Sequence, residues 1–420
     1  MLIIIDQLRA DYAEHLKKCS DILPYPAVCD TYSFPASTEA MHTNISTGKY
    51  PNLHGFTSKI AKNNLSGLEQ LIEKLRNIEL PSLALLGISN NFKVYAIGGK
   101  EETVRVMGHD TDCELLAYYN KEKSKDRFVY NTQNLLIGQF LDYLFNTCHY
   151  KRVPQQGWDK RALDIFNNIN SLDDNEKRFF ILTLSSLDKI GHDYGPHSEE
   201  VYNHLSFLDE SISAIIRDMP DSPVIITGDH GCRHTTRYLI EPSKENPQSI
   251  AVYNVAEDYI KFENEYLLKS FEDIKDIQYD GGILRIWLNS GKNLCESDLN
   301  FLSEHGYVFP HYINQGHADY ELIQLYENSR HENLGDIFVV AKGDTTFCKL
   351  GWITDTETKG NIKRRRDLIL GNLPIGEHGT YHDEDRKVGF LSNLSTINQT
   401  LKNTEIYSII ETIMNNSFHQ

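Results

Sequence analysis

The chain contains no pair of cysteines in a C-x-x-C spacing, and its seven cysteines are scattered and odd in number. This pattern favours free thiols in a reducing compartment over a disulfide framework. No apolar run approaches the roughly 18 residues that a membrane span requires. The first apolar run starts directly after Met1 and is interrupted by Asp6, which is not the pattern of a secretory signal. We therefore expect a cytoplasmic protein that is not bound to a membrane.

Positive charge is also scarce. There are 42 lysines and arginines against 59 acidic residues, and the formal net charge is −17. This balance argues against a nucleic-acid polymer or a membrane surface as a partner. A small phosphorylated substrate stays compatible with it, because bound cations and single lysines can reverse the field inside a cleft. The one strong basic run, Lys363-Arg364-Arg365-Arg366, reads as a solvated loop or, as the alternative, as a segment that holds substrate phosphates.

Short apolar runs alternate with helical patterns along most of the chain. Helical spacing of apolar residues recurs at 68–75 and at 201–215, the latter after a helix start at Ser198-Glu199-Glu200. The alternation predicts an α/β fold with a doubly wound, mostly parallel sheet flanked by helices. The runs that read as its buried strands are 2–5, 94–97, 179–184 and 224–227.

This alternation is interrupted in two places. The segment Lys121–Lys160 reads as a second, mostly helical insertion. From 240 to 345 the pattern changes to that of a smaller α+β insertion or cap, with a helix expected at 297–305 and strands expected at 282–288, 320–326 and 336–341. The expected organisation is a catalytic core formed by 1–239 and 346–420, with the insertion at 240–345.

Aspartate and histidine residues stand directly after several of the apolar runs. Taken singly, each has an ordinary explanation as a helix cap or as a hydrogen-bonded core histidine. In a doubly wound sheet, however, ligands bind beyond the carboxyl ends of the strands, so residues at these positions can converge on one edge. Six such donors are what two divalent cations of the zinc or manganese kind require. The six are Asp6, Asp188, His192, Asp229, His230 and His378.

A hydroxyl group for the same site comes from the segment 34–55. Residues Thr38–Ser46 can form a helix that ends near Gly48. A hydroxyl at the start of that helix meets free N–H groups and the helix dipole, which favour an anion such as a phosphoryl group. A bound cation would also lower the pKa of that hydroxyl. The alternative is that Ser37 or Thr38 serves only as the N-cap.

These strings resemble the alkaline phosphatase superfamily, and most closely its type I phosphodiesterase/nucleotide pyrophosphatase family. Their order along nearly the whole chain is the order in that family. The matching strings are Ile5-Asp6, Thr38 to Gly55, Asp188-x-x-Gly191-His192-x-x-Gly195-Pro196, Gly228-Asp229-His230-Gly231 and Gly376-x-His378-Gly379.

The resemblance implies two divalent metal ions, Zn2+ or else Mn2+. One ion would be held by Asp188, His192 and His378. The other would be held by Asp6, Asp229 and His230, with Thr38 touching it as the nucleophile. A phosphodiester or pyrophosphate bond would then be hydrolysed in two in-line displacements through a phosphothreonine intermediate. His42 falls on a family histidine that we interpret as structural, and His382 is a competing ligand candidate near His378.

Departures from the related patterns narrow the substrate. Sulfatases carry Cys or Ser in a C/S-x-P-x-R string, and residues 37–41 lack both the Pro and the Arg, which argues against a sulfatase. Lys59 stands where nucleotide pyrophosphatases place an Asn that contacts a phosphate oxygen. Lys100 matches one of two lysines by which phosphonoacetate hydrolases hold a substrate carboxylate, and Glu102 replaces the other. Lys59 and Lys100 are therefore candidate substrate-binding residues, with an ordinary surface position as the alternative for Lys100.

The leading hypothesis is a di-metal phosphodiesterase or pyrophosphatase that acts on a small phosphorylated substrate. The nearest alternative is a phosphomonoesterase or phosphonate hydrolase on the same scaffold. A more distant alternative is a catalytically silent relative that only binds metal. The complete set of six ligands together with the hydroxyl favours the enzyme, and no motif indicates an oligomeric state.

Overall fold

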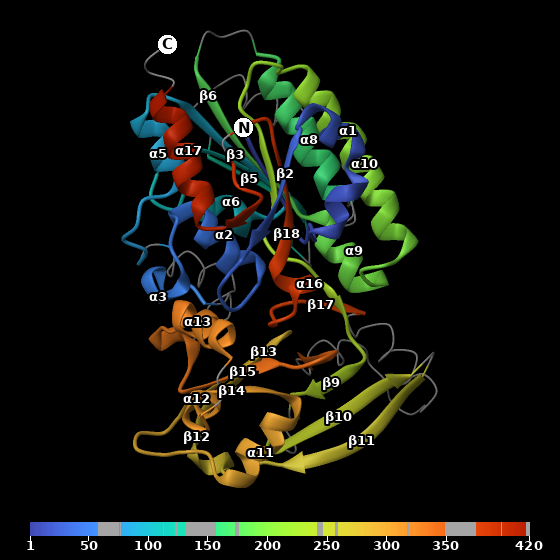
Figure 1. The fold of residues 1–420 in the computed structure, drawn as a ribbon, viewed down its shortest axis with the longest axis vertical. Helices are drawn as coiled ribbons and strands as arrows, with labels where there is room; N and C mark the ends of the chain where they lie inside the picture. The colour runs from blue at the N-terminus through green and yellow to red at the C-terminus, as the bar shows by residue number, and fades with distance from the viewer. Residues whose placement is uncertain are drawn as a thin grey trace.

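The computed structural model has two lobes, a larger one built around a wide sheet and a smaller one formed mainly by strands (Figure 1). None of the helices in the part that it describes is both long and apolar enough to cross a membrane. The structure describes residues 1–57, 75, 77–111, 113–121, 125–131, 157–172, 176–241, 247–256, 259–316, 319–348, 375–395 and 397–416.

The larger lobe contains a nine-stranded sheet in the order β19-β2-β18-β7-β1-β6-β3-β4-β5. Its centre is parallel: β1 pairs with both β6 and β7, so that Leu2 lies beside Ile181 on one side and Ile225 on the other. These strands are buried on both faces, which is why they read as continuous apolar runs and not as alternating patterns. The predicted central strands are confirmed as β1 (Leu2–Ile5), β3 (Lys93–Gly98), β6 (Arg178–Leu184) and β7 (Ile225–Gly228).

The outer strands make the sheet mixed. β4 continues the parallel run beside β3, whereas β5 is antiparallel to β4 and β18 is antiparallel to both β7 and β2. The prediction of a mostly helical Lys121–Lys160 is wrong over 125–131, which forms β5, and its residues 122–124 and 132–156 lie outside the described part of the chain. The outer strands are β2 (Tyr25–Asp30), β4 (Glu114–Lys121), β5 (Lys125–Asn131), β18 (Lys387–Ser392) and β19 (Thr400–Lys402).

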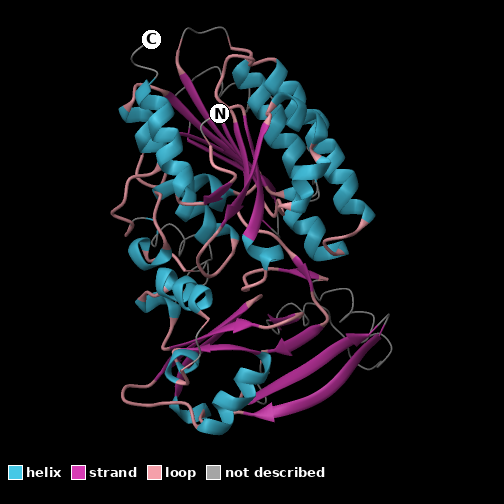
Figure 2. Ribbon diagram, in the orientation of Figure 1, coloured by secondary structure: helices cyan, strands magenta, loops and turns pink. Residues whose placement is uncertain are grey.

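Helices cover both faces of this sheet (Figure 2). Alternate residues of β1 show the division: Ile3 and Ile5 belong to one buried apolar cluster, and Leu2 and Ile4 to the other. The α/β class with a mostly parallel central sheet is therefore confirmed. The first cluster is covered by α1 (Lys17–Ile22), α8 (Trp158–Asn170), α9 (Ser186–Tyr194) and α10 (Glu199–Arg217), and the second by α2 (Thr38–Thr47), α5 (Leu83–Ser89), α6 (Glu101–Met107) and α17 (Glu405–Asn416).

The sequence correctly predicts the start of one of these helices and the end of another. The Ser198 side chain accepts a hydrogen bond from the N–H of Val201, so Ser198 is the N-cap of α10. Helix α2 ends at Gly48, which has a left-handed φ of 67°. The predicted helix at 68–75 lies outside the described residues except for Leu75.

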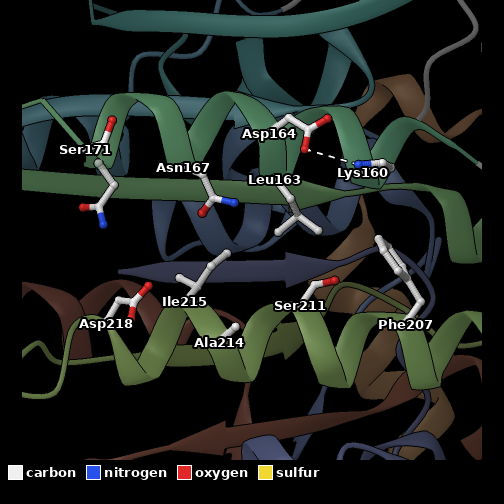
Figure 3. Close-up of a pocket in the computed structure, with 11 residues that line it drawn as sticks. Lys160, Leu163, Asp164, Asn167, Ser171, Phe207, Ser211, Ala214, Ile215 and Asp218 are labelled. Carbon is white, nitrogen blue, oxygen red and sulfur yellow. Dashed lines mark ion pairs between the residues drawn. The ribbon is translucent and has the colours of Figure 1, made fainter.

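Helices α8 and α10 enclose a pocket of about 480 Å³ between them (Figure 3). Its wall combines apolar side chains such as Leu163 and Ile215 with polar ones such as Asn167 and Asp218. None of the predicted site residues lines it, so this pocket is separate from the candidate active site.

The smaller lobe contains two four-stranded sheets that share one apolar cluster with α11 (Glu296–His305). Strands β9 and β16 lie at the edges of the expected 240–345 insertion and pair with each other in parallel. The division of the chain into domains at those bounds stays a prediction. One sheet consists of β9 (Arg237–Ile240), β10 (Ser249–Ala256), β11 (Tyr259–Leu267) and β16 (Thr345–Cys348), and the other of β12 (Ile274–Asp280), β13 (Ile283–Leu288), β14 (Gly306–Phe309) and β15 (Ile337–Ala341).

One prediction in this lobe is wrong. Residues 320–326 were expected to form a strand, but they lie in helix α13 (Tyr320–Ser329). The carboxylate of Asp319 accepts a hydrogen bond from the N–H of Leu322 and caps the helix, and Leu322, Leu325 and Tyr326 are buried at helical spacing. The remaining short elements are α3 (Pro51–His54), β8 (Arg233–His234), α12 (His311–Asn314), β17 (Gly376–Glu377) and α16 (Asp383–Arg386).

Candidate active site

The predicted ligands converge at the end of the large sheet that faces the smaller lobe. Asp6 follows β1, and the adjacent pair Asp229 and His230 follows β7. Asp188 and His192 lie on α9, which follows β6, and His378 follows the two-residue strand β17. In Figure 1 α2 and α9 lie on opposite faces of the wide sheet, toward its end near the smaller lobe, and β17 lies between that end and the smaller lobe.

One group of donors consists of Asp6, Asp229 and His230, and all three side chains are buried. The His230 Nε2 atom lies 3.3 Å from Asp6 Oδ1 and 3.5 Å from Asp229 Oδ2. The Thr38 hydroxyl joins this group: its oxygen lies 3.1 Å from His230 Nε2 and 3.4 Å from Asp6 Oδ1. The structure thus brings the proposed nucleophile and three predicted ligands into one cluster.

A second group of donors surrounds Asp188. Its Oδ1 atom lies 3.1 Å from His192 Nε2 and 3.8 Å from His378 Nε2. The His378 ring also stacks on the His230 ring, with the two ring centroids 3.8 Å apart. Asp188, His230 and His378 therefore form a set of close donors themselves, and the two groups are direct neighbours.

The backbone orients the three histidines. In each ring Nδ1 lies within hydrogen-bonding distance of a main-chain carbonyl, 2.7 Å from Gly376 O for His192 and 2.9 Å from Ala36 O for His378. His230 Nδ1 lies 2.9 Å from the carbonyl of the following residue, Gly231. With the proton on Nδ1, each Nε2 lone pair faces the carboxylates. This is the arrangement by which proteins orient metal-binding imidazoles.

The donor set fits two divalent cations. Asp188 Oδ1 and Asp229 Oδ2 are buried, and the groups near them in the described part of the chain are imidazole nitrogens, His192 Nε2 at 3.1 Å from the first and His42 Nδ1 at 3.3 Å from the second. Buried carboxylate oxygens are costly unless a cation, a hydrogen-bond donor or water satisfies them. Carboxylate oxygens combined with imidazole nitrogens are ligands that zinc and manganese accept.

Thr38 is the first residue of α2, a ten-residue helix. The preceding Ser37 is extended, and its side chain makes no capping hydrogen bond. The Thr38 hydroxyl points instead to Asp6 and His230. The first N–H groups of a helix have no partner inside it, so an anion bound beside Thr38 would find donors there.

Lys100 lies inside the site and not on the surface. Its Nζ atom is 2.6 Å from Asp6 Oδ2 and 2.9 Å from Asp188 Oδ2, so it bridges the two groups of donors. Burial by itself lowers the pKa of Lys100, but the two carboxylates outweigh burial and raise that pKa well above its ordinary value. Glu102 is buried in the first turn of α6. The fixed charge of Lys100 therefore balances part of the carboxylate charge.

The imidazoles balance the rest of that charge when no metal is bound. Burial lowers the pKa of His230, but Asp229 and Asp6 outweigh burial and raise that pKa to about 10. The same competition, with Asp188 as the main carboxylate, raises the pKa of His192 to about 9. Both rings thus hold protons at neutral pH, and divalent cations would have to displace these protons.

The other predicted residues lie outside these groups of donors. His42 lies on α2, with Nδ1 at 2.7 Å from Thr38 O and 3.3 Å from Asp229 Oδ2, so it is a neighbour of the donors. His382 begins α16 and belongs to none of the donor groups formed by the described residues. Lys59 and the basic run at 363–366 lie outside the residues that the structure describes.

Glu377 was missed by the sequence reasoning. Its side chain is buried, and its Oε1 atom lies 3.8 Å from His378 Nε2, so it forms a donor group with His192 and His378. Consecutive side chains of a strand point to opposite faces, so the sequence pattern argues against Glu377 and His378 contributing to the same site. The chain turns directly after the two-residue strand β17, at Gly379 with a φ of 101°, so this rule does not hold here.

Fold and site together define an α/β protein with a cluster of aspartate and histidine side chains beside a threonine at a helix N-terminus. The profile of the type I phosphodiesterase/nucleotide pyrophosphatase family matches residues 91–361, and the chain belongs to this family. The resemblance drawn from the sequence motifs is thereby confirmed. No curated protein sequence matches the chain.

Solved structures with the same fold include two kinds of enzyme. Murine ectonucleotide pyrophosphatase/phosphodiesterase 5 superposes with a TM-score of 0.58 at 14% identity, covering 99% of this chain and 94% of the murine one. Its inactive threonine-to-alanine variant, in complex with AMP, gives a TM-score of 0.57 at 14% identity, with the same coverage. Phosphonoacetate hydrolase from Sinorhizobium meliloti 1021, in complex with phosphonoformate, gives 0.58 at 14% identity, covering 98% and 95%. At this identity the similarity shows the fold alone.

Proposed function

We propose that the protein hydrolyses a phosphodiester or pyrophosphate bond of a small phosphorylated substrate, with Thr38 as the nucleophile and two divalent metal ions as cofactors. The observation that carries the proposal is the position of the Thr38 hydroxyl. It lies at the start of α2, 3.1 Å from His230 Nε2, beside two adjacent groups of carboxylate and imidazole donors. Membership of the type I phosphodiesterase/nucleotide pyrophosphatase family supports the same reaction class.

The residues divide between the two metal ions as follows. Asp6, Asp229 and His230, together with the Thr38 oxygen, would hold one ion. Asp188, His192 and His378 would hold the other. When bound, ions such as Zn2+ or Mn2+ would lower the pKa of the Thr38 hydroxyl, neutralise the substrate's charge and orient the leaving oxygen. The burial of Asp188 Oδ1 and Asp229 Oδ2 beside imidazole nitrogens supports this assignment.

Catalysis by the chain's own residues proceeds through Thr38. Its deprotonated oxygen attacks phosphorus in line with the leaving oxygen, a bond forms between Thr38 Oγ and phosphorus, and the bond to the leaving group breaks. With a diester, the resulting phosphothreonine still carries the second ester group. A water molecule then attacks phosphorus from the opposite side, and the bond between phosphorus and Thr38 Oγ breaks. The proton that Thr38 lost is balanced by protonation of the leaving oxygen, and a proton from the water returns to Thr38 Oγ. The N–H groups of the first turn of α2, which have no partner inside the helix, would stabilise the charge on the phosphoryl oxygens throughout.

Lys100 is proposed to contact the substrate. With cations held by Asp6 and Asp188, these carboxylates would bind the Lys100 ammonium group less strongly, and it could turn to the substrate. Its position between the two groups of donors would then place a positive charge next to a phosphoryl or carboxylate oxygen of the substrate. Lys59 stays a predicted substrate-binding residue on sequence grounds alone.

The second candidate function is a phosphonate hydrolase or phosphomonoesterase on the same scaffold. Lys100 favours it, because Lys100 matches one of the two lysines by which phosphonoacetate hydrolases hold a substrate carboxylate. The similarity to phosphonoacetate hydrolase supports this candidate at the level of the fold. Glu102 disfavours phosphonoacetate itself, because a second lysine would be expected at that position. We further propose a cytoplasmic location, which the six free cysteines of the described residues support.

The test is a comparison of bis-p-nitrophenyl phosphate with p-nitrophenyl phosphate, using protein loaded with Zn2+ or Mn2+. We expect faster hydrolysis of the diester, loss of activity on chelation and on Thr38→Ala, and recovery when metal is added back to the wild type. Thr47→Ala is the matched control, because Thr47 lies on the same helix and its hydroxyl donates to Thr43 O. Preference for the monoester would overturn the diesterase assignment. Activity that survives both chelation and Thr38→Ala would overturn the mechanism.

A further inference from the structure

A carboxylate outside the six predicted ligands lies at the edge of the second group of donors. Glu377 belongs to β17, which pairs with β8, and 4% of the residue's surface is exposed. Its Oε1 atom lies 3.8 Å from His378 Nε2 and 4.0 Å from His192 Nδ1. The same oxygen accepts a hydrogen bond from the His378 N–H at 3.1 Å, and a positively charged neighbour would further stabilise a carboxylate buried beside two histidine rings.

Glu377 does not orient either ring. The Nδ1 atom of His192 is already 2.7 Å from Gly376 O, and the Nδ1 atom of His378 is 2.9 Å from Ala36 O. Neither ring thus has an N–H left for Glu377. The nearest ring atom is His378 Nε2, which is the atom that faces the cation.

The donors beside Glu377 lie close enough to share a cation: His192, Glu377 and His378 form one donor set, and Asp188 and His378 belong to a neighbouring one. Tetrahedral ligands at about 2.0–2.3 Å from a metal lie roughly 3.3–3.7 Å from one another. Here Asp188 Oδ1 lies 3.1 Å from His192 Nε2 and 3.8 Å from His378 Nε2, and Glu377 Oε1 lies 3.8 Å from the same His378 atom. We propose that Glu377 is a fourth protein ligand of the ion held by Asp188, His192 and His378. This proposal rests on the di-metal site of the proposed function.

The smaller lobe sets the position of this carboxylate. The turn between β12 and β13 contains Gly281 and Gly282, and the Gly282 N–H donates to His378 O at 2.9 Å. A Cβ atom at Gly281 would lie 2.7 Å from Glu377 Oε1, and one at Gly282 would lie 2.4 Å from His378 O. The two glycines therefore leave the space that the Glu377 carboxylate and the His378 main chain occupy.

A fourth protein ligand affects the choice of metal. The site would have two carboxylates and two imidazoles, which fill all four positions of a tetrahedral zinc ion and leave none for substrate. An ion that accepts five or six ligands, such as Mn2+, keeps a position open, and an additional carboxylate favours the harder ion. We expect Mn2+ to be preferred over Zn2+ at this site, relative to the site that contains Thr38.

Metal titration of the full-length chain tests the proposal without relying on activity. Mn2+ binding is followed by electron paramagnetic resonance, and Zn2+ binding by competition with a chromophoric chelator. The wild type should bind two ions per chain. In Glu377→Gln the affinity of one Mn2+ should fall at least about tenfold, with the other unchanged and Zn2+ less affected. Glu272→Gln is the control, because Glu272 is exposed on the smaller lobe, and this variant should bind both ions as the wild type does.

A second variant displaces the carboxylate without removing it. Gly281→Ala places a methyl group against Glu377 and should weaken the same ion. Gly343→Ala is matched to it, because Gly343 has a similar φ of 54°, against 62° for Gly281, but has nothing within 4 Å of its Cβ position. If both Glu377→Gln and Gly281→Ala bind two ions with wild-type affinity, Glu377 is not a ligand, but the proposed function is unaffected. A wild type that binds no metal would overturn the proposed function together with the role of Glu377.

Discussion

At the scale of single residues, several side chains of the site each have two polar atoms. One of them contacts a main-chain group, so the other faces the site. Each of the three histidines has Nδ1 at a main-chain carbonyl, and Asp229 Oδ1 accepts the N–H groups of Gln7 and His230. These bonds fix which atom faces the site before any metal arrives. Removing the metals should therefore leave the donors nearly in place.

Thr38 carries the most direct prediction at this scale. Thr38→Ala should lower kcat/KM for a diester by at least about a thousandfold, because the attacking oxygen is lost. Thr38→Ser keeps a hydroxyl at the start of α2 and should retain a measurable part of the activity. Steady-state kinetics of both variants checks this. Equal losses in the two variants would mean that the hydroxyl is not the nucleophile.

Burial of His54, which lies outside the proposed metal site, predicts that the stability of the protein depends on pH. Burial, aided by the nearby His331 and His109, lowers the pKa of His54 to about 3. The unfolded chain therefore binds one more proton than the folded chain between about pH 6.5 and pH 3. The contribution of His54 to stability is full above pH 6.5 and is lost as the pH falls through this window.

The measurement is denaturant unfolding of the wild type and of His54→Asn from pH 7 down to pH 4. Asn keeps an acceptor for the Phe56 N–H, which donates to His54 Nδ1, but it cannot take up a proton. The gap between the two free energies of unfolding should narrow by a few kcal/mol as the pH falls. Parallel curves would show that the ring does not titrate as the structure requires.

At the scale of elements, the smaller lobe contacts the segment that carries the proposed nucleophile, Thr38. The Ser329 hydroxyl of α13 accepts a hydrogen bond from the Phe34 N–H, and the Asn328 side chain donates to Tyr32 O. On the other side of α2, the Asn333 side chain donates to Gly55 O. The lobe therefore supports α2 at both ends, in addition to contacting the loop of His378.

Removing the bond to Phe34 should cost stability. Ser329→Ala leaves the buried Phe34 N–H without an acceptor and should lower the free energy of unfolding by about 1–3 kcal/mol. Ser206→Ala is the matched control, because both hydroxyls donate to the carbonyl four residues earlier but Ser206 is exposed. That variant should stay within about 0.5 kcal/mol of the wild type. Denaturant titration checks both, and equal losses would contradict the role of the Phe34 contact.

Elements with long apolar runs were the predictable part of the fold. The strand at Leu2–Ile5 and the helix after Ser198 follow directly from a buried run and a capping residue. Residues 320–326 were misread because a short stretch with several apolar side chains fits either periodicity, and the cap at Asp319 was not recognised. The strand at 125–131 has no such run. Among the described strands β5 is at the edge of the sheet beside β4, where fewer apolar side chains are needed.

At the scale of the whole molecule, the convergence of the site could be predicted from the order of the strands. Asp6 and Asp229 follow neighbouring parallel strands, so they had to meet once the sheet formed. The bridging position of Lys100 and the carboxylate of Glu377 could not be predicted in this way. Both depend on tertiary packing. The position of Lys100 depends on the turn after β3, and that of Glu377 on the contact between the smaller lobe and the loop of His378.

The clustering of three carboxylates predicts that metal removal destabilises the whole molecule. An ion that binds only the folded chain adds about 2.7 kcal/mol at a hundred times its Kd. Chelated protein should thus unfold at a lower denaturant concentration than protein loaded with Zn2+ or Mn2+. Asp188→Asn should reduce this difference, since one donor group then lacks its central ligand. Unfolding that is independent of metal would contradict the assignment of these groups as metal ligands.

A covalent intermediate on Thr38 can be trapped by acid quenching during turnover of bis-p-nitrophenyl phosphate, followed by mass spectrometry of the digested protein. The peptide containing Thr38 should carry a phosphoryl group with one nitrophenyl ester still attached. This adduct should be absent from Thr38→Ala and from the chelated protein. Steady turnover with an unmodified Thr38 peptide, or with the adduct on another residue, would show that Thr38 is not the nucleophile.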